Sequence, residues 1–240
     1  MKKALTASFL TLSFATMSAN AQSLFSHTFD GSANEVGPAL QAFTNGVGTN
    51  TSDINAGTLF GSGNGAPGFN TVSGMDLSSY SGFTVEFVVE SNFSGIVGAS
   101  TNGVFFGITN STTSNATDGT ALYNNAGSST GTAIGLQYGN GRGVAGADFA
   151  LDEVNGNGSF TAIDTLNATG EYTDDATNGY VISITYALDS GTGNTAVTIT
   201  SAGLANNISY STVAATNYAA LASLVTPNIS TQNGLSLIHI

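Results

Sequence analysis

Cysteine and tryptophan are absent from this 240-residue chain, and it holds only two histidines. Without cysteine it can form no disulfide and has no thiolate for catalysis or metal binding. A zinc site lacks its usual ligands, and a nucleophilic triad would depend on His27, the one histidine before the last residues. The absence of tryptophan also removes the usual stacking platform for sugar rings.

Positive charge is almost as scarce. Three Lys and Arg residues stand against fifteen Asp and Glu, and outside Lys2 and Lys3 the only cation is Arg142. A chain with a net charge of −12 has no surface that could neutralise phosphates. We therefore expect neither nucleic acid nor an anionic lipid surface as a partner.

The first residues have the features of a secretory signal peptide. Lys2 and Lys3 precede a short apolar stretch, and Ala19–Ala21 supplies the small residues of a cleavage site. The apolar stretch is shorter than the ~20 residues that a membrane-spanning helix needs, and no other segment is suitable. We predict a signal peptide over 1–21 and a bacterial protein that is secreted or held at the cell surface or outer membrane.

The last six residues, Leu235–Ile240, differ in composition from everything before them. Their codons can spell the transposon-end adapter of sequencing libraries, so we interpret them as translated adapter. The natural protein would then continue past Gly234, and 22–234 would be a single domain that lacks its last strand. A native terminal strand is the alternative, because leucine and isoleucine alternate with polar residues there.

Short β-rich runs between Gly, Asn and Asp turns predict an all-β domain. The clearest run, Phe83–Glu90, alternates apolar and polar residues, and a hairpin is expected where Tyr180–Leu188 and Thr195–Ser201 flank the letters DSGTGN. The other expected strands are Leu24–Phe29, Gly103–Thr109, Thr132–Gly139, Ala147–Leu151, Ser159–Ile163 and Ile208–Val213.

One helix is expected over Thr216–Val225. Thr216 or Asn217 could cap its first turn, and Leu221 would lie on its apolar side. Pro227 is expected to end it.

The order of these segments resembles the concanavalin A-like lectin/glucanase sandwich of the laminin-G-like kind. The letters that carry the resemblance are LFSHTFDG, LSSYSGFTVEFVVE, NGVFFGIT, TAIGLQYG and YVISITYALDSGTGNTAVTIT, which together span most of the chain after the signal peptide. The resemblance implies a two-sheet antiparallel jelly roll, here with one short C-terminal helix. It also implies a polysaccharide or cell-surface glycan as partner, and a C-terminal anchor is common in exported proteins of this style.

Catalysis would depend on Glu86 and Glu90. Hydrolysis of a sugar by this fold generally uses two carboxylates, and EFVVE resembles a glycoside hydrolase signature in which Val88 replaces an aspartate. Because that orienting aspartate is missing, we favour two solvent-facing glutamates and a protein that is not an enzyme.

Calcium is the one cofactor that remains open, because it binds carboxylate and carbonyl oxygens in loops. Two oxygen-rich stretches, LDEVNGNG and YTDDATN, could supply them, although turn formation alone also explains both. The candidate ligands are Asp152, Glu153, Asp174 and Asp175.

Arg142 is the candidate centre of a ligand site. It follows Tyr138 in a glycine-rich stretch and could bind a ligand carboxylate, such as that of a uronic acid, with Tyr138 and Asp148 beside it. Alternatively it pairs with Asp148 or Asp152 at the surface.

These observations predict an exported, non-catalytic module for carbohydrate binding or cell-surface adhesion. Two alternatives stay open: a β-glucanase-type glycoside hydrolase that uses Glu86 and Glu90, and a structural surface or matrix protein without a soluble ligand.

Overall fold

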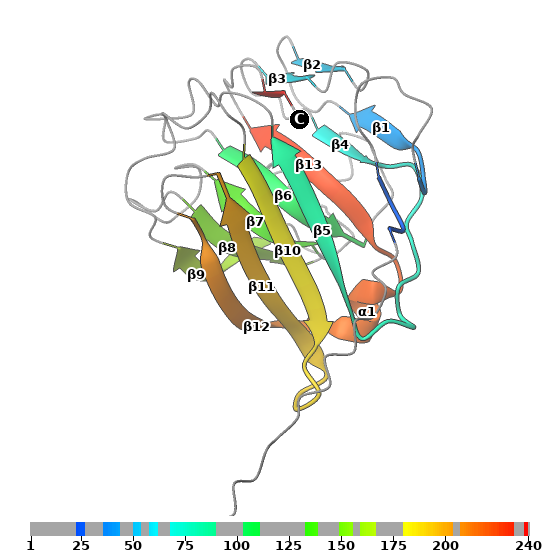
Figure 1. Cartoon of the computed structure of the whole chain (residues 1–240), viewed down its shortest axis with the longest axis vertical. Helices are drawn as coiled ribbons and strands as arrows, with labels where there is room; N and C mark the ends of the chain where they lie inside the picture. Colours follow the sequence, from blue (N-terminus) through cyan, green and yellow to red (C-terminus); the bar gives the residue numbers. More distant parts are fainter. Residues whose placement is uncertain are drawn as a thin grey trace, which may run out of the picture.

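Alternation of apolar and polar residues builds two antiparallel sheets that pack face to face (Figure 1). The structure is a computed structural model, and it describes residues 23–26, 36–43, 50–53, 58–61, 68–89, 103–110, 133–138, 149–155, 159–166, 180–203, 207–232 and 238–239. The strands are β1 (Leu40–Phe43), β2 (Asn50–Asp53), β3 (Thr58–Gly61), β4 (Gly68–Thr71), β5 (Gly82–Val89), β6 (Gly103–Thr109), β7 (Ala133–Tyr138), β8 (Phe149–Asn155), β9 (Ser159–Leu166), β10 (Tyr180–Leu188), β11 (Asn194–Ala202), β12 (Ser209–Asn217), β13 (Thr226–Gln232) and β14 (Ile238–His239), and the helix is α1 (Tyr218–Ala222).

Three sheets are present in the described residues. The four-stranded sheet has the order β12-β11-β10-β5 and lies in front of the seven-stranded sheet, of order β1-β4-β13-β6-β7-β8-β9, in Figure 1. A small sheet of order β14-β3-β2 lies at one end. The two-sheet antiparallel sandwich with one short helix is therefore confirmed.

Several strands form where the sequence predicts them. β6 and β10 have the predicted bounds, and β10 and β11 form the expected hairpin. In its loop the Gly193 N–H donates to the Asp189 carbonyl at 2.8 Å, and Gly193 has a φ of 76°. Glycine adopts that left-handed conformation without strain, so its place in the loop has a physical cause.

Other expectations need correction. β8 begins two residues later than predicted and extends to Asn155, because its pairing with β9 continues beyond Leu151 through a bulge. β1 to β4 and β13 are additional strands that the sequence pattern did not reveal. Of the strand expected over Leu24–Phe29, the structure describes only the first three residues, and Ser26 makes a single bridge to Val36.

The helix is shorter than predicted. Asn217 caps it as expected, since its Oδ1 accepts a hydrogen bond from the Ala220 N–H at 3.1 Å. The prediction that Pro227 ends it is wrong. The helix ends at Ala222, after which the Val225 N–H donates to the Met75 carbonyl at 2.8 Å and starts the return into β13. No helix of the described part is long and apolar enough to cross a membrane.

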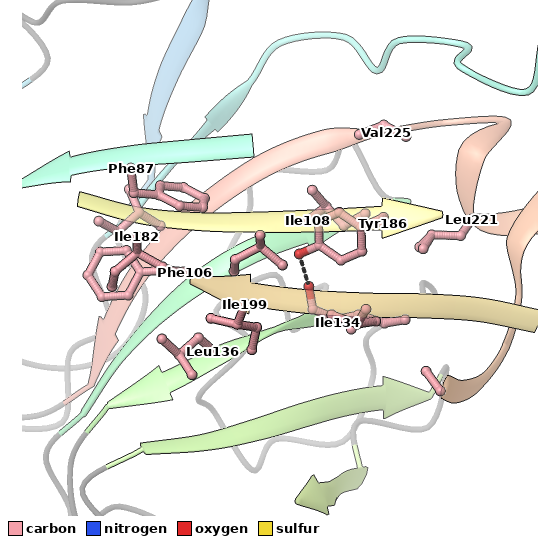
Figure 2. Packing of buried hydrophobic residues seen from close by; sticks show 14 of the residues in the cluster. Phe87, Phe106, Ile108, Ile134, Leu136, Ile182, Tyr186, Ile199, Leu221 and Val225 are labelled. Carbon is pink, nitrogen blue, oxygen red and sulfur yellow. Dashed lines mark hydrogen bonds between the residues drawn. The ribbon is translucent and has the colours of Figure 1, made fainter. Parts of the chain in front are cut away.

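The hydrophobic core lies between the two large sheets (Figure 2). Phe87 of β5 and Phe106 of β6 meet across it with ring centroids 5.5 Å apart. The buried Tyr186 hydroxyl crosses the same space and donates to the Ile134 carbonyl at 2.8 Å (Figure 2). Burial raises the pKa of Tyr186, so its hydroxyl stays protonated and this bond joins the two sheets at any ordinary pH.

Candidate functional site

The central strands of the seven-stranded sheet, β6, β7 and β13, are buried on both faces. Ile108, Ile134 and Ile229 belong to the core between the sheets. Because successive strand residues alternate between faces, their neighbours lie on the opposite face, and these neighbours are buried as well. We call this second surface the covered face; it carries Phe105, Gly107, Thr109, Ala133, Gly135, Thr226 and Asn228.

Two glycines make room for an aromatic ring on the covered face. Gly107 pairs with Gly135, and a Cβ added to them would lie 2.7 Å and 2.5 Å from Phe105 Cζ, respectively. A Cβ would also run into backbone, the Ile134 carbonyl oxygen at Gly107 and the Phe106 carbonyl oxygen at Gly135, so both positions require glycine. Phe105 is fully buried over these glycines although it is not part of the core between the sheets.

Asn228 is the polar residue of this row. Its register partner is Gly107, and the side chain is 1% exposed. Within the described residues, neither its Nδ2 nor its Oδ1 has a hydrogen-bond partner, and the Thr226 Oγ1 on the same face lacks one as well. A buried carboxamide without partners costs about 1–3 kcal/mol, and each such group in a native protein calls for an explanation, such as strain, a catalytic or binding role, or an ordered water.

Chemically, the Asn228 carboxamide offers two N–H donors and one carbonyl acceptor on the face that also carries Phe105. A ligand with neighbouring hydroxyl groups could satisfy both kinds of group at once. This makes the covered face around Asn228 the candidate site.

The structure places the first pair of predicted calcium ligands in a strand and not in a loop. Asp152 and Glu153 lie in β8, where Asp152 pairs with Gly135 and Glu153 with Ile134. In the described part of the chain, no three His, Asp or Glu side chains are close enough to hold a metal.

The remaining metal and ligand candidates are only partly described. Asp174, Asp175, Arg142 and Asp148 lie outside the described residues. Tyr138 ends β7 and pairs with Phe149, the residue that directly follows Asp148 in the sequence.

The predicted catalytic pair is likewise half described. Glu86 lies on β5 with its side chain exposed, on the face of the four-stranded sheet that points away from the core. The Ser183 hydroxyl donates to Glu86 Oε1 at 2.9 Å. Glu90 lies outside the described residues, so the distance between the two predicted carboxylates is not described.

Comparison with solved structures shows that this sandwich has the fold of several plant lectins. The chain superposes on basic winged bean lectin, solved with Tn-antigen, with a TM-score of 0.50 and 14% identity over 81% of this chain and 82% of that one. The fold is that of the concanavalin A-like lectins and glucanases. A metal-free lectin I-B4 from Griffonia simplicifolia (TM-score 0.47, 14% identity, 83% and 89% coverage) and arcelin-5, a lectin-like defence protein of Phaseolus vulgaris (0.49, 12%, 84% and 89%), are further structural neighbours.

Sequence comparisons add nothing to this likeness. No protein-family profile matches the chain, and a search of curated proteins finds no similar sequence.

Sequence reasoning missed Asn228. Its segment, TPNISTQ, has a proline as its second residue and contains one large apolar residue, Ile229. The available signal was alternation, since Asn228 occupies one face and Ile229 the other.

Proposed function

We propose that this chain is the carbohydrate-binding module of an exported protein that acts at the cell surface or in the extracellular matrix, and that Asn228 binds the sugar. The signal-peptide pattern at residues 1–21 supports export. The lectin fold supports the class of ligand, since one structural neighbour was solved with Tn-antigen.

The observation that carries this proposal is the unpartnered carboxamide of Asn228. A carboxamide that is 1% exposed lowers stability unless something in the protein's working state satisfies it. Sugar hydroxyls both donate and accept, so two neighbouring hydroxyls match the amide N–H and carbonyl of one asparagine.

The test is a glycan array with the purified chain and with Asn228→Leu, each with and without calcium. Leucine has a similar size but no polar atoms, so it removes the unsatisfied group without opening a cavity. We expect the wild-type chain to bind at least one glycan and the variant to lose that binding. The melting temperature of the variant should rise, because a destabilising group of about 1–3 kcal/mol is gone.

Three results would count against the proposal. Binding that survives Asn228→Leu would remove this residue from the site. A blank array with and without calcium would favour a structural matrix protein. Hydrolysis of laminarin, agar, carrageenan, alginate or xylan that is lost in Glu86→Gln would make the protein a glycoside hydrolase.

A further inference from the structure

The outer face of the four-stranded sheet carries two parallel rows of small polar side chains. We call it the open face, because most of these side chains are exposed (Figure 1 views the molecule from this side). The register of β5, β10, β11 and β12 aligns the members of each row across all four strands. The first row is Glu86, Ser183, Thr200 and Ser209, and the second is Thr84, Thr185, Thr198 and Ser211.

Hydroxyl groups in these rows bond to one another. Thr84 Oγ1 and Thr185 Oγ1 are 2.8 Å apart, and Thr198 Oγ1 and Ser211 Oγ are 2.9 Å apart. In both pairs either oxygen could be the donor, so each pair keeps both donor and acceptor capacity for an outside group. Partner groups that also donate and accept, namely hydroxyls, fit such pairs best.

Charge is nearly absent from the open face. Glu86 is the only ionisable side chain in the two rows, whereas the chain as a whole has a net charge of −12. An anionic partner would be repelled by the protein, and a cationic partner would find a single carboxylate that already accepts a bond from Ser183. The electrostatics therefore disfavour an anionic partner, and the open face itself offers a cationic partner only this one carboxylate.

The residues that flank the rows are small and apolar. Val88, Val181 and Ala202 lie on one side, and Ala187, Ala196 and Val213 lie on the other. Val88 is 53% exposed and Val213 46% exposed. Among the described positions of the open face there is no aromatic side chain, and Glu86 is the longest one, so an extended chain could lie along the hydroxyls.

We propose that the open face binds a neutral polysaccharide whose chain lies along the two hydroxyl rows, across the strands. Three strand spacings of ~4.8 Å make each row ~14 Å long, enough for a few sugar residues. A polysaccharide chain can follow the twist of the sheet by rotating about its glycosidic bonds. This second site does not depend on binding at Asn228, which lies on the other sheet.

A second copy of the chain fits the open face less well. Two sheets can pack face to face, but both copies would carry a net charge of −12. Because the two copies repel each other, we do not expect self-association. It remains the competing outcome of the test.

The experiment measures depletion of the chain from solution by cellulose, curdlan, agarose and galactomannan gels, with alginate and carrageenan as anionic counterparts. The test variant is Thr185→Val/Thr198→Val. It removes the two central hydroxyls of one row and keeps the side-chain shape. The matched control is Thr212→Val, because Thr212 pairs with the buried Val197 and so lies on the core side of the same sheet.

We expect binding to at least one neutral polysaccharide and to neither anionic one. Loss of two hydrogen bonds should weaken it roughly tenfold in the double variant, with no change in the control. Circular dichroism melts should show both variants folded; if the double variant is not, Ser211→Ala provides the same test with one smaller change.

Four outcomes would overturn the proposal: no binding to any of the four neutral polysaccharides, equal binding by the double variant, preferential binding to alginate or carrageenan, or binding that only Asn228→Leu abolishes. The last would leave the proposed function standing and remove the second site. A concentration-dependent dimer in light scattering that the double variant loses, with polysaccharide binding unchanged, would make the open face an interface between two copies.

Discussion

The covered face and the open face use the same class of small residues for opposite purposes. On the covered face, Gly107 and Gly135 leave space that the Phe105 ring fills, and the surface is buried. On the open face, threonines such as Thr84 and Thr185 pair across strands and stay exposed. A composition rich in glycine, serine and threonine therefore does not decide how a strand is used; its position in the two sheets does.

The largest expected change in stability comes from adding a side chain at the buried Gly107–Gly135 pair. Gly135→Ala puts a Cβ 2.5 Å from Phe105 Cζ, so the ring or the backbone must move. We expect the free energy of unfolding to fall by about 3 kcal/mol, the upper part of the usual range for overpacking. Urea denaturation followed by circular dichroism measures it.

The same substitution on the open face is the control. Gly82→Ala would place its Cβ 3.2 Å from the nearest atoms, the Ala187 Cβ and the Tyr186 carbonyl oxygen, which is tight but not a clash. We expect a change of less than about 1 kcal/mol in either direction, since alanine also restricts the unfolded chain. Equal losses in the two variants would contradict the distinction between the faces.

We expect calcium to bind neither at the covered face nor at the open face. If the acidic residues outside the two faces bind it, calcium at one hundred times its dissociation constant would stabilise the fold by about 2.7 kcal/mol. We expect Asp174→Asn/Asp175→Asn to abolish the calcium-dependent rise in melting temperature, and Glu86→Gln to leave it intact. An unchanged melting temperature after EDTA treatment would end the calcium hypothesis.

Removal of the Tyr186–Ile134 hydrogen bond, which joins the two sheets, should lower the free energy of unfolding by an intermediate amount. Tyr186→Phe removes the donor to the Ile134 carbonyl and leaves that buried oxygen without it, which should cost about 1–3 kcal/mol. Tyr218→Phe removes a similar 2.7 Å bond to the carbonyl of Tyr80, a residue that is 43% exposed, so water can replace it and about 0.5–1.5 kcal/mol is expected. A larger loss for Tyr218→Phe would show that the bond between the sheets is not the stronger one.

The sequence predicts the open face better than the covered face. β5 and β10 alternate apolar and polar residues, because one side of each strand packs on the core and the other meets solvent. β6 and β7 are buried on both sides, so GVFFGIT shows no alternation to reveal which residues share a face. The strand was predictable, whereas the second role of Phe105 was not.

The candidate site was less predictable than the fold. Asn228 became a candidate because of strand register. It lies beside Gly107 because β13 returns between β4 and β6. That pairing joins residues more than a hundred positions apart and has no local signal. Apart from Tyr138, the sequence-based candidates were chosen for their charge, and Asn228 has none.

The smallest expected effect concerns the hydroxyl pairs of the open face. Thr84→Val and Thr185→Val should each change the free energy of unfolding by less than about 0.5 kcal/mol, because both sites lie on a solvent-facing surface. A double-mutant cycle on these two residues should give a coupling of about 0.2–1 kcal/mol, the usual size for a cross-strand pair. Thr84→Val with Ser211→Ala is the control cycle, because these residues sit at opposite ends of one row and do not pair.

A coupling near zero for Thr84 and Thr185 would mean that their hydroxyls bond mainly to water. The open face would then present unpaired hydroxyls to a polysaccharide, and Thr185→Val would weaken binding without any loss of stability.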